Sequence, residues 1–96
     1  MRWTWDPRKA AANRDKHGVS LATAARVFDD PLHASVPDPH PDGDRWRTIG
    51  VVGPVTLLVV HTLPRIEHEG GEPVGRIISA RKATVRERKA YEEVGI

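Results

Sequence analysis

The longest apolar run of the chain extends from Val55 to Val60 and is interrupted only by Thr56. The run is far too short to span a bilayer, and it suits a buried strand. A turn is expected just before it, at Gly53-Pro54. We therefore predict that residues 55–62 form a strand that is buried on both faces and lies centrally in a sheet.

Capping residues mark the ends of the predicted helices. Asp6-Pro7 can begin the first helix, because Asp accepts from free backbone N–H groups and Pro fits the first helical position. Gly18 can end it in a left-handed conformation, and Ser20 can cap a second helix. In chain order we expect a strand at 2–5, helices at 7–17 and from 20 to about 29, a loop with room for a short edge strand around 33–36, strands at 45–52, 55–62 and 74–80, and a helix that starts with a Thr84–Glu87 capping box and ends near 94.

This order of elements predicts an α+β fold with a single antiparallel sheet of three to four strands, two N-terminal helices and one C-terminal helix. The 96 residues are enough for one domain, 1–96, with one modest core. The chain has no cysteine, which favours a reducing compartment, and its first residues show no apolar signal segment. We therefore expect a cytoplasmic protein without a membrane segment.

Basic residues are concentrated near the C-terminus, although the formal net charge is only +2. Between residues 76 and 89, Glu87 is the only acid among the basic side chains. This cluster predicts an electropositive end of the fold that suits nucleic acid, although a charge run can also be a solvated face. Its members are Arg76, Arg81, Lys82, Arg86, Arg88 and Lys89.

The histidines do not have the spacing of a metal site. No two of the five lie at i and i+4 on a predicted helix, and there is no cysteine to complete a zinc ligand set. The chain also lacks a glycine-rich phosphate loop before a helix. We therefore expect no metal and no other cofactor.

Two places in the chain offer groups that could transfer a proton. His61 is expected at the rim of the central strand, where it could be a general base or a core-edge histidine bonded to a backbone carbonyl. Lys16 and His17 end the first predicted helix, where the macrodipole favours positive charge. That position suits a phosphate contact or a general acid, or it is simply a favourable helix end.

Arg76 and Arg81 are candidate phosphate ligands near the end of the last predicted strand. An arginine there can fork onto a phosphate and stabilise a pentacovalent transition state, or it can pair with a surface carboxylate. Five residues separate the two arginines, which places them on opposite faces of a regular strand unless Arg81 has already left it.

Other side chains could contact RNA around these groups. Tyr91 could donate to a phosphate at the basic surface, or it could only dock the last helix onto the sheet. The remaining candidates for RNA binding are the basic residues Arg45, Arg47, Lys82 and Arg88.

Several short stretches follow one another in an order that is typical of one family. The most specific are residues 16–20, Lys-His-Gly-Val-Ser, and residues 76–84, Arg-Ile-Ile-Ser-Ala-Arg-Lys-Ala-Thr. With the further matches they resemble the BrnT family of toxins from type II toxin–antitoxin systems over nearly the whole chain. The further matches are residues 5–9, Asn13, residues 25–31, residues 44–47, Gly50, the apolar residues 57–60, Glu87-Arg88 and Tyr91.

The resemblance implies a RelE-like fold and a ribonuclease that cleaves RNA without a metal and inhibits translation. It also implies neutralisation by a cognate antitoxin whose ribbon-helix-helix part binds DNA, so that DNA is contacted through the complex. Two departures from the family pattern are the long loop at 64–73, which could alter substrate access, and Asp44, where a glutamate is common. The alternative function is a non-catalytic nucleic-acid or protein-binding module that represses transcription with its partner.

Overall fold

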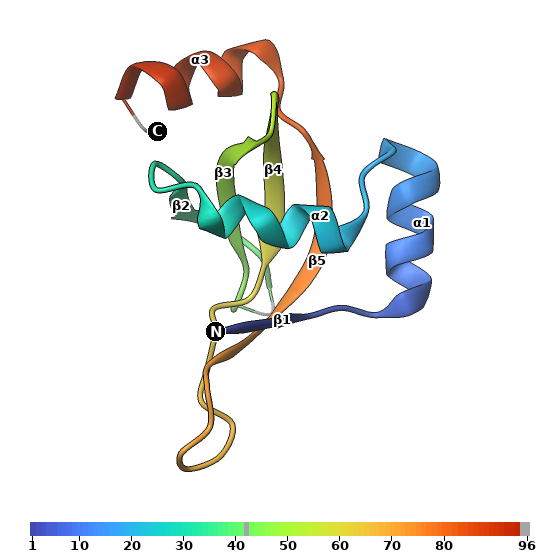
Figure 1. Ribbon diagram of the computed structural model, residues 1–96, viewed down its shortest axis with the longest axis vertical. Helices are drawn as coiled ribbons and strands as arrows, with labels where there is room; N and C mark the ends of the chain where they lie inside the picture. The colour runs from blue at the N-terminus through green and yellow to red at the C-terminus, as the bar shows by residue number, and fades with distance from the viewer. Residues whose placement is uncertain (42, 95–96) are drawn as a thin grey trace.

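The computed structural model of the protein describes residues 1–41 and 43–94. Figure 1 shows one sheet, with α2 crossing in front of it, α1 beside β5 and α3 at the end where β5 finishes. The elements in chain order are β1 Arg2–Thr4, α1 Pro7–His17, α2 Leu21–Ala25, the 3-10 helix η1 Arg26–Asp29, β2 Ala34–Pro37, β3 Trp46–Val52, β4 Val55–His61, β5 Val74–Lys82 and α3 Val85–Val94.

The sheet has five strands in the order β1-β5-β4-β3-β2, so β4 is central as predicted. Strands β2 to β5 form an antiparallel meander, but β1 pairs with β5 in parallel. The α+β class is confirmed, whereas the prediction of a purely antiparallel sheet of three to four strands is wrong. A three-residue strand at the edge gives no periodic signal from which its partner or direction could be deduced.

The two faces of the sheet have different surroundings. Residues that pair directly across strands point to the same face, so the register assigns each side chain to one of them. On one face, Leu57, Val59 and Ile77 pack against Leu21 of α2 and Val27 of η1. On the opposite face, which we call the open face, Tyr91 of α3 packs on Ile49 and Leu58. Among the described residues, α3 is the helix that packs on the open face, and it covers one end of it.

The helix caps form as their residues predict, although the second helix is shorter than expected. Gly18 has φ 70° in the left-handed region, and Ser20 Oγ accepts from the Thr23 N–H at 3.0 Å. The α-helical part after Ser20 ends at Ala25 and continues as the 3-10 turn η1. Tightening of a last turn into 3-10 geometry is a common way to satisfy the final carbonyl groups of a helix.

Two buried or half-buried side chains complete the backbone hydrogen bonding where the neighbouring edge strands are too short. β1 pairs with β5 only as far as Arg76. Further along β5, the buried Asn13 amide donates to the Ala80 carbonyl at 2.9 Å and accepts from the Ala80 N–H at 3.0 Å. On the other side, the Asp30 carboxylate accepts from the Val51 N–H at 2.8 Å, beyond the reach of β2.

We expect Asn13→Ala to lower the free energy of unfolding by about 2–4 kcal/mol, because it removes three hydrogen bonds and strands buried backbone groups. Asp15→Ala, at an exposed site on the same helix, should change it by less than about 0.5 kcal/mol. Urea unfolding of both variants measures the difference. Equal stabilities would show that Asn13 does not hold α1 to β5.

Candidate active site

A bulge in β5 brings Arg76 and Arg81 to the same face of the sheet. The register between β4 and β5 shifts so that Ile78 has no partner in β4. One extra residue reverses the alternation of side chains, and both arginines therefore project from the open face. The prediction of opposite faces fails for this reason. The two arginines nevertheless cannot belong to one small site, because about 13 Å of strand separates them.

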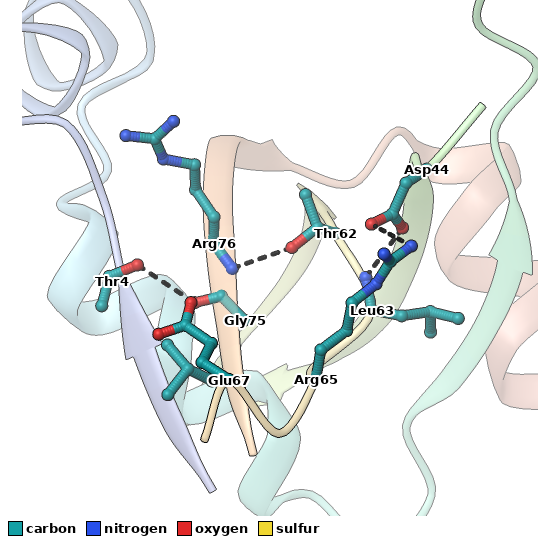
Figure 2. Close-up of a pocket in the computed structure, with 9 residues that line it drawn as sticks. Thr4, Asp44, Thr62, Leu63, Arg65, Glu67, Gly75 and Arg76 are labelled. Carbon is teal, nitrogen blue, oxygen red and sulfur yellow. Dashed lines mark hydrogen bonds and ion pairs between the residues drawn. The ribbon is translucent and has the colours of Figure 1, made fainter. Parts of the chain in front are cut away.

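A cavity of about 400 Å³ lies on the open face at the end of the sheet away from α3. Four segments meet there: β1, the loop before β3, the segment after β4 and the beginning of β5 (Figure 2). The lining residues are Thr4, Asp44, Thr62, Leu63, Arg65, Glu67, Val74, Gly75 and Arg76.

Arg76 forms one wall of this cavity on a rigid backbone. Its N–H donates to the Thr62 hydroxyl at 3.0 Å, and its carbonyl accepts from the Thr62 N–H at 3.0 Å. The Thr4 hydroxyl donates to the carbonyl of the adjacent Gly75 at 3.3 Å. The guanidinium is exposed and makes no ion pair with another residue of the described part of the chain, which leaves it available to an anion.

The opposite wall is held in place by Asp44. Its carboxylate accepts from the Leu63 N–H at 3.1 Å and pairs with the Arg65 guanidinium, also at 3.1 Å (Figure 2). Arg65 and Val74 exchange two backbone hydrogen bonds of 3.0 and 2.8 Å, so the base of the loop at 64–73 is tied to β5. Glu67 follows on the same loop, exposed at the cavity and without an ion pair to any other described residue.

The structure places His61 in the core, with only 2% of its surface exposed. Its Nδ1 lies 2.7 Å from the Thr62 carbonyl, which can only accept, so Nδ1 carries the proton. Nε2 faces the Thr48 hydroxyl, and the rings of Trp3 and Phe28 enclose the imidazole. Burial lowers the pKa of His61 below its ordinary value, which favours the neutral form. Both ring nitrogens therefore have hydrogen-bond partners within the protein, as expected for a core-edge histidine bonded to a backbone carbonyl.

Arg81 is held by an intramolecular ion pair. It donates two hydrogen bonds, of 2.7 and 3.0 Å, to the Glu87 carboxylate. Glu87 and Thr84 also form the predicted capping box at the start of α3. The hydrogen bonds from Arg81 lower the pKa of Glu87 to about 2. Arg81 thus connects β5 to α3. It pairs with a carboxylate, which was the alternative to binding a phosphate.

Lys16, His17 and Lys82 lie away from the cavity. Lys16 and His17 end α1, whose Asn13 contacts β5 at Ala80, near the opposite end of the strand from Arg76. Lys82 pairs with Leu57 and therefore points to the helix-covered face. The structure does not bring these three cations together with Arg76.

The other predicted RNA contacts are dispersed. Arg47 projects from the open face near the beginning of β3, with Nε 3.3 Å from Asp38, and Arg45 lies just before that strand. Arg88 is exposed on α3 and lies 3.9 Å from Glu92. Tyr91 is buried, and its hydroxyl donates to the Asp30 carboxylate, an interaction that raises the pKa of Tyr91 to about 12. Tyr91 therefore docks α3 on the sheet.

The described residues contain neither a candidate metal site nor a candidate membrane span. Within 1–41 and 43–94, no three His, Asp or Glu side chains gather as a group that could hold a metal ion. Across the same part of the chain, no helix is long and apolar enough to cross a membrane.

Sequence reasoning missed four polar residues that line the cavity with Arg76. Arg65 and Glu67 belong to a segment that was predicted only as a mobile loop, and Thr4 and Thr62 carry no motif. The sequence drew attention to Asp44 and to the long loop at 64–73. That both lie beside Arg76 depends on the tertiary structure. The signal that was available is the pair of opposite charges at 65 and 67, directly after the central strand.

A comparison with known families identifies the class to which the chain belongs. A family model described as a ribonuclease toxin of type II toxin–antitoxin systems matches residues 5–87, which is most of the chain. The protein therefore belongs to the BrnT family of such toxins. Membership in a type II system implies a protein antitoxin as partner. No curated protein sequence matches the chain.

We expect the protein to lose stability as the pH falls from 7.5 to 5.5, because the pKa of His61 is lower in the folded than in the unfolded state. Well above pH 6.5 the imidazole is neutral in both states, and its contribution to stability is constant. Below that value the unfolded chain takes up a proton that the buried ring resists. Urea unfolding should show this slope in the wild type and in His68→Gln, but a smaller slope in His61→Gln. An unchanged slope in His61→Gln would contradict it.

Proposed function

We propose that this chain is a metal-independent endoribonuclease that uses the internal 2′-hydroxyl of RNA as nucleophile. The observation that carries the proposal is the cavity around Arg76, whose lining includes two arginines, two threonines and the acids Glu67 and Asp44. These are the groups that such a reaction needs: cations for the phosphate and an acceptor for one proton.

The reaction assigns a role to each group. Arg76 binds the non-bridging oxygens of the scissile phosphate and stabilises the charge that develops on them. Arg65, which is paired with Asp44, adds positive charge at the opposite wall. Glu67 takes the proton of the 2′-hydroxyl, whose oxygen attacks phosphorus. The P–O5′ bond breaks, and the 5′-oxygen receives a proton from water. The products are a 2′,3′-cyclic phosphate and a 5′-hydroxyl.

Glu67 is the proton acceptor in this proposal because it is exposed at the cavity, whereas the histidines are not. Both ring nitrogens of His61 are occupied within the core. His17 lies at the end of α1, near the far end of β5. We therefore assign Lys16 and His17 to contacts with RNA phosphates outside the cleavage site. We assign Arg81 to the attachment of α3.

The biological setting of this activity is part of the same proposal. Cleavage of RNA in the cytoplasm would inhibit translation, and binding of the antitoxin would neutralise it. The antitoxin would contact DNA through a ribbon-helix-helix part, which is an expectation of the family resemblance alone.

We predict that Arg76→Ala lowers kcat/KM for RNA cleavage about 100-fold, because it removes a cation that is aimed at the transition state. Arg8→Ala, which removes an exposed cation on α1, should stay within about twofold of wild type. Cleavage of a labelled oligoribonucleotide by the purified variants measures both rates. Equal rates for the two variants would contradict the site, and a wild type that binds RNA without cleaving it would favour the non-catalytic alternative.

We predict that Glu67→Gln lowers the rate at pH 7 by about 100-fold, because the amide cannot accept the proton. Glu69→Gln is the matched control, since Glu69 is an exposed acid on the same loop that does not line the cavity. Cleavage of the labelled oligoribonucleotide by both variants and the wild type measures the effect. Full activity in Glu67→Gln would return the role of base to a histidine.

A further inference from the structure

A second hollow on the open face has the opposite chemical character from the Arg76 cavity. It measures about 280 Å³ and lies between α3 and the sheet. We call it the α3 groove. Val36, Ile49 and Leu58 line it from the sheet and Ala90 from the helix, while Arg47, Arg86 and Glu87 complete the lining.

The charges around the α3 groove favour an acidic ligand. The carboxylate of Glu87 is already neutralised by its two hydrogen bonds to Arg81. Arg86, which lines the groove, is exposed and has no ion pair among the described residues. The Nε atom of Arg47 is buried and makes no hydrogen bond within the described structure, although Asp38 lies 3.3 Å away.

The α3 groove also adjoins an open edge of the sheet. β2 is the last strand in the order β1-β5-β4-β3-β2, so its outer side is unpaired among the described strands. Val36 lies on this strand and also lines the groove. An extended peptide can add beside such an edge through its backbone and insert alternate side chains into an adjoining pocket.

From these three features we infer that the α3 groove is a docking site for an acidic segment of the protein antitoxin. The segment lies as an extra strand beside β2, places an apolar side chain in the groove and turns a carboxylate toward Arg86 and Arg47. A protein fits better than RNA, because the lining holds no aromatic ring on which a base could stack, and a polynucleotide has no strand backbone to pair with β2. The inference rests on family membership and does not require the proposed cleavage chemistry.

The test measures binding of the purified cognate antitoxin by isothermal titration calorimetry, a readout that does not depend on cleavage. Ala90→Arg fills the groove, and Arg86→Glu reverses its charge without filling it. Each should raise Kd at least about tenfold, whereas Lys89→Glu, on the same helix but outside the lining, should change it by less than about threefold. Hydrogen exchange should also show protection of the β2 amides on binding.

Three results would overturn the inference. The first is wild-type affinity in both groove variants. The second is equal weakening by Lys89→Glu, which would reduce the effect to general charge attraction. The third is loss of affinity for an oligoribonucleotide in place of the antitoxin, which would assign the groove to the RNA path. Thermal unfolding checks that the variants fold, and Arg86→Glu carries the test if Ala90→Arg does not.

Discussion

The covering of one face of the sheet by α1, α2 and η1 is the constraint on which the rest of the structure depends. That face holds the larger core cluster, in which Leu57, Val59 and Ile77 pack against residues of the helices. The opposite face is covered at one end by α3 (Figure 1). Part of the sheet therefore stays open, and Arg76, which projects from it, remains available to a ligand.

The position of α3 depends on polar contacts more than on apolar area. At its start, Glu87 binds Arg81 and caps the helix backbone. Further along, Tyr91 donates to Asp30, which also accepts from the Val51 N–H and so joins the helix to the edge of β3. These contacts hold α3 above the sheet so that a groove remains beneath it. The proposed partner site and the Arg76 cavity therefore lie on the same open face but have no lining residue in common.

Much of the fold could be predicted from local signals. The caps at Asp6, Ser20 and Thr84 and the apolar run of β4 located the helices and the central strand. The parallel pairing of β1 could not be predicted, because three residues carry no information about their neighbour. The bulge at Ile78 was equally invisible, since apolar side chains occupy both faces of β5 at that point, and it changed the face on which Arg76 lies.

The site was harder to predict than the fold, because it is assembled from distant segments. Arg76 was identified as a candidate from charge and position, but its neighbours Thr4, Asp44 and Arg65 meet it only through the sheet order and the loop after β4. His61 is the converse case, because its residue type suggested a site role as well as a place at the edge of the core. The structure encloses its ring between Trp3 and Phe28, which makes it part of the core.

The central claim is that side chains alone cleave RNA through its own 2′-hydroxyl. The most direct measurement is cleavage of an oligoribonucleotide by the purified protein in excess EDTA, with analysis of the new ends by mass spectrometry. The account predicts full activity, 2′,3′-cyclic phosphate and 5′-hydroxyl ends, and no cleavage where the ribose at the cut site is replaced by 2′-deoxyribose. Activity that requires an added divalent ion, or cleavage of the 2′-deoxy substrate, would contradict it.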